Sequence, residues 1–294
     1  MKIIFIGAVT FSEKLLEHLI LLKADIVGVI TTSEKKQYSD YSDLSSLCKK
    51  NNISLIKTND INSKEIILWA REKKPDLIFC FGWNRLLKEE ILSIPPKGVI
   101  GYHPAKIPKN RGRHPIIWAL VLGLKETGSS FFYIDKEADS GDIISQRKVD
   151  ISESDNANSL YKKLVKKAQE QLSEFLPLLL KNKIKKKKQD LYKSNLWRKR
   201  GEPDGIIDWR MSSKSIYDLV RALSKPYIGA YFLYNKKKYI IWSVKRVSIR
   251  GFSNIEPGKV VRLKNNLQLI KCGEGFISIE ESYPKLKLKD GEYL

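Results

Sequence analysis

The chain has 294 residues, 42% of them hydrophobic, so it can bury a sizeable core and is not disordered throughout. This length predicts about two domains. Lysine and arginine number 54 against 33 for aspartate and glutamate, a net charge of +21. That surplus indicates either a polyanionic partner (tRNA, DNA, an anionic membrane, a phosphorylated substrate) or a general lysine bias in a chain also rich in Ile and Asn.

Cysteine and histidine are sparse: Cys48, Cys80, Cys272, His18, His103 and His114. The cysteines form no C-x-x-C pair, which argues against a disulfide scaffold and a zinc ribbon and suits a reducing compartment. A histidine-rich metal site is not expected. The apolar start is too short for a signal peptide, and no window is long enough to span a membrane. We therefore expect a cytoplasmic protein with no metal and no membrane partner.

The first hundred residues alternate between strand and helix patterns. Ser12 is a candidate cap for the first helix. Expected strands are 2–6, 25–31, 53–56, 76–81 and 98–103, and expected helices follow Ser12 and span 43–50 and 63–73. The β-α-β order predicts the α/β class, with a doubly wound, Rossmann-like, mostly parallel sheet whose ligands bind beyond the carboxyl ends of its strands.

After residue 120 the pattern changes. Two strands at 128–135 and 142–150 precede a long amphipathic helix from 156 to about 180. Residues 181–200 hold ten Lys or Arg and one acid, which fits an exposed linker or a nucleic-acid contact. Later runs predict a short helix at 215–223 and strands at 239–247, 259–262, 267–271 and 275–279. We expect a domain at 1–180, a basic linker at 181–204 and a smaller β-rich, OB-like domain at 205–294.

Several enzyme motifs are missing. Gly7 stands alone where a dinucleotide-binding fingerprint needs G-x-G-x-x-G, so a nicotinamide-dependent dehydrogenase is disfavoured. No G-x-S-x-G nucleophile elbow and no P-loop occur, which also disfavours α/β-hydrolases and P-loop NTPases.

Residues 98–120, GVIGYHPAKIPKNRGRHPIIWAL, are the densest candidate site. His103 closes an apolar strand, a position that is often purely structural. The following prolines hold a loop open, and Gly112 allows close backbone approach. Arg111 and Arg113 then precede an apolar helix, where they can meet an anion. A second segment, Ala138–Asp142 (ADSGD), reads by turn chemistry alone as an ordinary hairpin turn.

Together the two segments resemble the N10-formyltetrahydrofolate-dependent formyltransferases. Their signature is N-x-H-x-x-x-x-P-x-x-R-G-x-x-P followed by D-x-G. This chain has G-Y-H-P-A-K-I-P-K-N-R-G-R-H-P, and Asp139-Ser140-Gly141 begins 36 residues after His103. Residues 204–231 resemble the stretch that joins the two domains of methionyl-tRNA formyltransferase and its sugar-modifying relatives. Residues 258–279 resemble their C-terminal barrel, so the resemblance spans nearly the whole chain.

The resemblance implies roles for particular residues. His103 would face the oxyanion of the tetrahedral intermediate. Asp139 would orient or charge the imidazole of His103 and would take up the amine proton. No metal is required. The pterin head of N10-formyltetrahydrofolate would lie against Phe81, Gly82, Trp83 and Ala138, although both aromatic residues could instead be core or rim. Acceptor contacts would come from Tyr102, Asn110, Arg111, Gly112 and Arg113.

One position departs from the signature. The family asparagine two residues before the histidine, thought to hold the formyl oxygen, is Gly101 here. Losing one oxyanion donor costs roughly 2.7–4 kcal/mol of transition-state stabilisation. Either another group substitutes, with Asn110 as a candidate, or the protein is a catalytically impaired relative.

Three interpretations of the acceptor compete. Residues 31–50 lack the Gly- and Lys-rich insertion of methionyl-tRNA enzymes, and R-G-R-H-P replaces their R-G-A-A-P. Two arginines suit a diphosphate. We therefore expect a nucleotide-linked amino sugar, with a 4-amino-4,6-dideoxy sugar for surface polysaccharide, glycan or lipopolysaccharide biosynthesis favoured by resemblance. Initiator tRNA is the runner-up, and a non-catalytic binding protein is third. Glycinamide ribonucleotide transformylase is disfavoured because such chains lack the C-terminal domain. A homodimer is compatible with the sequence.

Overall fold

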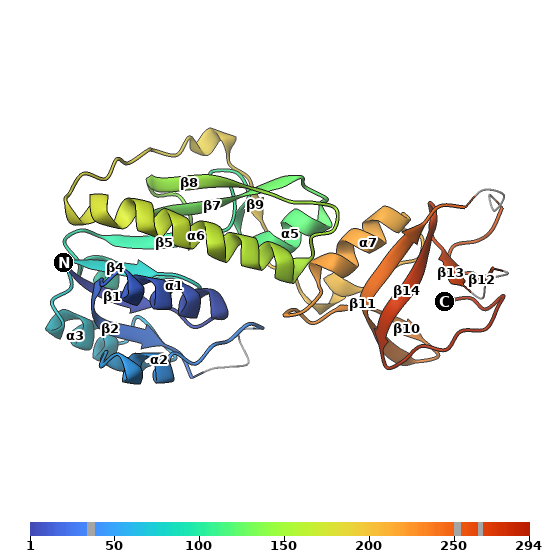
Figure 1. Ribbon diagram of the computed structural model, residues 1–294, viewed down its shortest axis with the longest axis horizontal. Coiled ribbons are helices and arrows are strands. Elements are labelled where there is room, and N and C mark those ends of the chain that lie inside the picture. Colours follow the sequence, from blue (N-terminus) through green and yellow to red (C-terminus); the bar gives the residue numbers. More distant parts are fainter. Residues whose placement is uncertain (34–38, 250–253, 264–266) are drawn as a thin grey trace. The chain divides into compact units, whose positions relative to one another are not determined.

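The computed structural model describes residues 1–33, 39–249, 254–263 and 267–294. The chain forms two compact units (Figure 1). Unit 1 comprises residues 1–115, 127–150 and 162–197, and unit 2 comprises 116–126, 151–161 and 198–294. The sequence predicts that the first domain ends at residue 180 and the second begins at residue 205. The chain passes for the last time from unit 1 to unit 2 between these positions, after residue 197.

Unit 1 is built on a seven-stranded sheet with the order β3-β2-β1-β4-β5-β7-β8. The strands from β1 to β5 pair in parallel, and β7 runs antiparallel to β5, so the expected α/β class is confirmed. The strands are β1 (Lys2–Ile6), β2 (Asp25–Thr31), β3 (Leu55–Lys57), β4 (Leu77–Cys80), β5 (Val99–His103), β7 (Glu126–Tyr133) and β8 (Ile143–Asp150).

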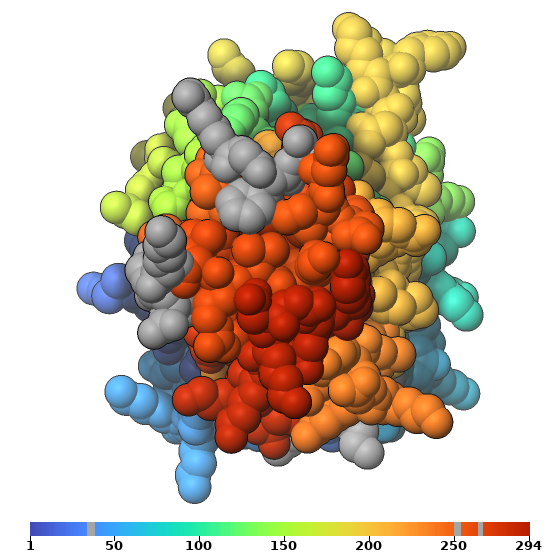
Figure 2. Space-filling view, turned by 90° about the vertical axis from the view of Figure 1, so that its right-hand side faces the viewer, coloured from blue at the N-terminus to red at the C-terminus, as the bar shows by residue number. Residues whose placement is uncertain are grey.

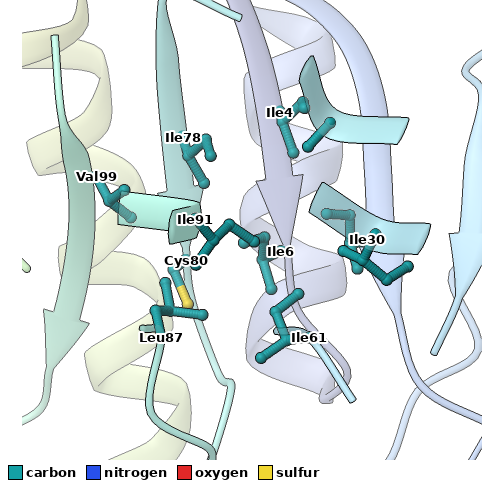
Figure 3. Close-up of a cluster of buried hydrophobic side chains, with 11 residues drawn as sticks. Ile4, Ile6, Ile30, Ile61, Ile78, Cys80, Leu87, Ile91 and Val99 are labelled. Atoms are coloured by element: carbon teal, nitrogen blue, oxygen red, sulfur yellow. The ribbon is translucent and has the colours of Figure 1, made fainter. Parts of the chain in front are cut away.

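Helices cover both faces of this sheet. On one face, α1 lies beside α6, where His18 and Ser173 share a 2.8 Å hydrogen bond and Phe175 packs on Phe131. On the other face, α3 and α4 contribute to a buried cluster around Ile4 and Ile6 (Figure 3). The helices of unit 1 are α1 (Thr10–Leu21), α2 (Ser45–Lys50), α3 (Lys64–Glu72), α4 (Glu89–Leu92) and most of α6 (Ala157–Leu180). The helix α5 (Pro115–Val121) belongs to unit 2 except for its first residue.

The central strands are apolar along their whole length because both of their faces are buried. Ile3, Ile4, Phe5 and Ile6 of β1 have no exposed surface. Side chains alternate between the faces of a strand, so Ile4 and Ile6 point toward α3 and α4, and Phe5 points toward the opposite face. A parallel sheet between two helical layers requires this composition.

The first strand-to-helix turn differs from the expectation that Ser12 caps a helix. The helix begins at Thr10, and the Ser12 hydroxyl accepts from the backbone N–H groups of Ala8 and Val9. It also donates to the Phe81 carbonyl at 2.6 Å. A Cβ at Gly7 would lie 2.5 Å from the Cβ of Ser12. Amides that would face a phosphate in a dinucleotide-binding fold are therefore satisfied internally.

Unit 2 contains a five-stranded antiparallel half-barrel with the order β10-β11-β14-β13-β12, as expected for a small β-rich domain. Figure 2 shows its residues in orange and red on the face turned to the viewer. The Ser212 hydroxyl caps α7 (Ser213–Ala222), which contacts β11 and β14. The strands are β10 (Ala230–Tyr234), β11 (Lys237–Val247), β12 (Val260–Arg262), β13 (Gln268–Lys271) and β14 (Phe276–Tyr283).

Two very short strands connect distant parts of unit 1. β6 (Arg111–Gly112) pairs in parallel with β9 (Leu196–Trp197). β9 lies within the basic stretch between the expected domains, which also contains a 3₁₀ turn, η2 (Leu191–Lys193). A second 3₁₀ turn, η3 (Glu202–Gly205), follows in unit 2. Within the described residues, no helix is both long enough and apolar enough to cross a membrane.

The fully buried cluster predicts a large effect of truncation at its centre. Ile6→Ala should lower the free energy of unfolding by about 2–5 kcal/mol, because it removes apolar contacts and leaves a cavity. Leu21→Ala is the control, since Leu21 is 74% exposed and its loss should change stability by less than about 0.5 kcal/mol. Urea unfolding followed by circular dichroism measures both values. Equal stability of the two variants would contradict this assignment of the core.

Candidate active site

His103 ends β5 at the carboxyl edge of the sheet. Its side chain is 7% exposed, and its Nε2 donates to the carbonyl oxygen of Asn110 at 2.9 Å. Its Nδ1 lies 3.6 Å from Oδ2 of Asp139. Each ring nitrogen therefore faces an oxygen acceptor. The two residues that the D-x-G spacing singled out are brought together, although 36 residues of chain separate them.

The loop that carries Asp139 is constrained at two points. Asp139 adopts a left-handed backbone conformation with φ of 57°, and its Oδ2 also accepts from the backbone N–H of Gly112 at 3.1 Å. Two residues on, a Cβ at Gly141 would overlap the carbonyl oxygen of Tyr133. Only glycine permits that approach. The glycine of the D-x-G motif thus closes the turn that aims the carboxylate at the imidazole.

Arg111 joins the two loops of the site. Its side chain is 7% exposed. The guanidinium donates through Nε and Nη2 to the carbonyl of Ala138 and through Nη2 to Oε1 of Glu137, the latter at 2.6 Å. Arg111 therefore points into the protein toward the 136–141 loop, and its Nε and Nη2 are already engaged there.

The remaining residues of the 110–113 loop are more accessible. Arg113 is exposed, and its Nη1 donates to the carbonyl of Asn84 at 3.2 Å. Asn110 has φ of 64°, and its backbone N–H donates to the side-chain oxygen of Asn195 at 2.9 Å. Gly112 has φ of 102°, and a Cβ there would overlap the carbonyl of Trp197. This side of the loop is held by β9.

The structure explains why Gly101 cannot simply be replaced by the family asparagine. A Cβ at Gly101 would lie 2.8 Å from Cγ1 of Ile134 and 3.2 Å from Cζ of Phe132. Both neighbours belong to apolar clusters beneath the site, which occupy the space that an asparagine side chain would enter. At this position apolar side chains fill the space that a polar side chain would need.

Tyr102 lies apart from His103. Side chains alternate along β5, and the Tyr102 ring stacks on Phe11 with a centroid distance of 4.3 Å. Its hydroxyl accepts from Ser129 at 3.0 Å. Burial raises the pKa of this phenol well above its usual value. The structure therefore does not bring Tyr102 together with the other acceptor-binding candidates.

The candidates after β4 differ from one another. Phe81 is fully buried among Phe5, Phe79 and Phe131, and its backbone N–H and carbonyl are bonded to Ile6 and Ser12. Gly82 has φ of 71°. Trp83 is half-buried, and its Nε1 is buried without a hydrogen-bond partner among the described residues. Trp83 thus has an unused donor at the carboxyl edge of the sheet.

Two amide residues that contact the site loops were not expected from the sequence. Gln189 donates to the carbonyls of Asp139 and Gly141, and Asn195 contacts the 110–111 backbone. The sequence gives little indication of their role, because the basic stretch around them holds several other uncharged residues as well. No group of three or more His, Cys, Asp or Glu residues in the described parts of the chain is arranged to hold a metal ion.

The chain belongs to the formyl transferase family. A family model described as formyl transferase matches residues 1–176, and one described as formyl transferase, C-terminal domain, matches residues 201–289. These two matches confirm the resemblance inferred from the sequence motifs, and with it the expectation of an enzyme of formyl transfer.

Two curated proteins with different names are similar to this chain. The bifunctional polymyxin resistance protein ArnA of Wigglesworthia glossinidia brevipalpis is 36% identical over 269 residues, covering 90% of this chain and 40% of the relative. The methionyl-tRNA formyltransferase of Caldanaerobacter subterraneus subsp. tengcongensis is 32% identical over 301 residues, covering 100% of this chain and 96% of the relative. The chain thus spans less than half of ArnA.

Solved structures share the fold. An N-formyltransferase from Helicobacter canadensis, in complex with folinic acid and dTDP-3-aminofucose, has a TM-score of 0.73 at 20% identity, covering 96% of this chain and all of that chain. A variant of HypX from Aquifex aeolicus has a TM-score of 0.66 at 18% identity, covering 96% of this chain and 44% of that chain.

The bonds of Arg111 predict a structural role that lysine cannot fill. Arg111→Ala and Arg111→Lys should both speed amide hydrogen exchange in residues 136–141. Alanine removes the forked contact with Ala138 and Glu137, and the single ammonium of lysine cannot reproduce it. Arg111→Ala should also lower the free energy of unfolding by about 1–3 kcal/mol. Arg113→Ala is the matched control, and its stability should stay within about 0.5 kcal/mol of the parent. Unchanged exchange in the Arg111 variants would refute the role.

Proposed function

We propose that the chain transfers the formyl group of N10-formyltetrahydrofolate to the amine of a nucleotide-linked amino sugar. The observation that carries this proposal is the pairing of His103 with Asp139 at the carboxyl edge of the sheet, with Nδ1 and Oδ2 3.6 Å apart. Imidazole and carboxylate are the two side-chain types that acyl transfer to an amine needs at one place, for oxyanion stabilisation and proton transfer.

The proposed reaction exchanges one carbon–nitrogen bond for another. The folate supplies an activated formyl group. The acceptor amine bonds to the formyl carbon, the carbonyl oxygen carries negative charge in the intermediate, and the bond from carbon to N10 then breaks. The amine loses one proton and N10 gains one, so no redox partner is needed. In this proposal the Nε2 proton of His103 turns from the Asn110 carbonyl to the oxyanion, and Asp139 orients the imidazole and accepts the amine proton.

The residues after β4 fit the flat pterin head of a folate. The buried and unpartnered Nε1 of Trp83 can donate a hydrogen bond, and its indole can stack on a heteroaromatic ring. A Cβ at Gly82 would lie 2.5 Å from the Ser12 hydroxyl, so only glycine fits where the chain turns after β4. Phe81 would contribute only as the buried support beneath this position, and Ala138 would complete the pocket from the other loop.

For the acceptor, the exposed Arg113 is the better placed of the two arginines. Its guanidinium makes one hydrogen bond to a carbonyl, which leaves donors for a diphosphate. Asn110 and the backbone of Gly112 flank it. Arg111 would act indirectly, by holding the loop. With Gly101 lacking a side chain, any second donor to the oxyanion must come from another group, such as the Asn110 amide.

Initiator tRNA is the second candidate acceptor. The net charge of +21 and the similarity to a methionyl-tRNA formyltransferase favour it. Against it is the segment after β2, where Asp43 accepts from the Ser45 hydroxyl and Lys57. The hydroxyl bond lowers the pKa of this carboxyl, and its ion pair with Lys57 leaves no net positive charge at this point for an acceptor stem. Residues 34–38 of this segment lie outside the described residues.

The catalytic assignment predicts a coupled loss of turnover. His103→Ala and Asp139→Asn should each lower kcat by about 100-fold or more, and the double variant should lose little beyond the worse single variant, because the two groups act as one unit. The assay follows formyl transfer from N10-formyltetrahydrofolate to a panel of nucleotide-linked amino sugars and to charged initiator tRNA. Lys136→Ala in the same loop is the control, being 78% exposed. Near-parental turnover in either site variant would sink the assignment.

The basic stretch separates the two acceptors. Reversing Lys181, Lys183 and Lys185 to Glu should leave kcat and KM for a nucleotide sugar unchanged, because these side chains are exposed. Lys186 is kept, since its ammonium lies 3.9 Å from the Tyr133 ring centroid. The activity should also vary little with salt, because a diphosphate carries few charges. A tenfold loss with unchanged Tm, together with a steep salt dependence on tRNA, would favour the tRNA acceptor.

A further inference from the structure

One segment of unit 1 touches both loops of the proposed active site. We call residues 187–197 the strap. At its start, the backbone N–H and carbonyl of Lys187 exchange hydrogen bonds with those of Ile143, each 2.8 Å long. At its end, β9 pairs with β6. Between these two points the strap carries three exposed apolar residues, Leu191, Tyr192 and Leu196. Polar contacts, rather than burial of these side chains, therefore hold it on the loops.

Gln189 binds the loop of Asp139. Its Nε2 donates to the carbonyl of Asp139 at 2.9 Å and to the carbonyl of Gly141 at 2.7 Å. Both contacts require a donor, which fixes the orientation of the amide. The opposite atom, Oε1, is buried without a partner among the described residues. The amide therefore works through its NH₂ group and bridges the two ends of the D-x-G turn.

Asn195 binds the loop that receives His103. Its side-chain oxygen accepts from the backbone N–H of Asn110 at 2.9 Å, and its own carbonyl accepts from the N–H of Arg111 at 3.1 Å. The carbonyl of Asn110 is the acceptor of the His103 Nε2 proton. Asn110 has φ of 64°, a conformation that a residue with a side chain seldom adopts unless its surroundings hold it.

We propose that Gln189 and Asn195 are positioning residues, which set Asp139 and His103 at their mutual distance by holding the two loops from one strap. The inference rests on the proposed formyl transfer, in which these two side chains act together. Gln189 fixes the backbone from which the carboxylate projects, and Asn195 fixes the peptide that orients the imidazole. A misplacement of about 1 Å at reacting groups costs on the order of 100-fold in rate, so loosening either loop should be visible in turnover.

Two isosteric substitutions are expected to have opposite effects on activity, which makes the test more specific. Asn195→Asp keeps an acceptor oxygen for the Asn110 N–H, and it should retain most activity where Asn195→Ala does not. Gln189→Glu replaces the donor with a carboxylate that faces two carbonyl oxygens, so it should be no better than Gln189→Ala. Tyr192→Ala is the control within the strap, because this side chain is fully exposed.

Steady-state kinetics provide the first measurement. Gln189→Ala, Gln189→Glu and Asn195→Ala should lower kcat by about 10- to 100-fold with KM for the folate within about twofold of the parent, because loop position rather than binding is changed. Asn195→Asp and Tyr192→Ala should stay within about threefold. Thermal melting checks that each variant folds. Parental kcat in both alanine variants would overturn the proposal, as would equal losses in Asn195→Asp and Asn195→Ala.

The second measurement needs no acceptor and so separates this inference from the proposed function. The chain has three histidines, so ¹⁵N-labelled histidine gives few ring signals, and His103→Ala assigns one of them. Asn195→Ala should shift or broaden the His103 ring signals, whereas Asn195→Asp should not. Unchanged signals in Asn195→Ala would refute the role of Asn195. A parent enzyme that formylates neither sugars nor tRNA would refute the proposed function, even if the histidine signals respond as expected.

Discussion

The buried guanidinium of Arg111 holds together the two loops on which this site depends. It bridges to the Ala138 carbonyl and to Glu137, while the neighbouring amide of Gly112 donates to Asp139. An imidazole and a carboxylate cooperate only when they lie close together, and here Nδ1 and Oδ2 lie 3.6 Å apart although 36 residues of chain separate them. The cross-loop contacts, rather than the sheet alone, therefore determine whether the pair exists as one unit.

The sheet provides the frame for that unit. Its parallel strands end at a common edge, where β4 and β5 place the Trp83 region and His103. The neighbouring strand β7 runs antiparallel to β5 and leads into the loop that carries Asp139. The turn between β1 and α1 differs from the corresponding turn of a dinucleotide-binding fold. Ser12 accepts from the amides that would face a dinucleotide phosphate, so these amides are not available to a ligand.

Gly101 shows that packing and chemistry are coupled at this edge. Ile134 and Phe132 fill the space beside it, which makes the absence of an asparagine part of a consistent apolar arrangement. Restoring the family residue would require changes in these neighbours as well. The strap adds a second coupling, because a basic segment expected to be an exposed linker or a nucleic-acid contact supplies the amides that bind both loops.

The sequence by itself determined the α/β class, the strand that ends at His103 and the turn at Asp139, because short-range periodicity and spacing encode these features. Strand alternation in the sequence also places Tyr102 on the face opposite His103. Only the tertiary structure decided that Arg111 points inward and that Gln189 and Asn195 reach loops 50 and 85 residues away. Such contacts depend on how the whole chain folds back, and no local pattern of residues specifies them.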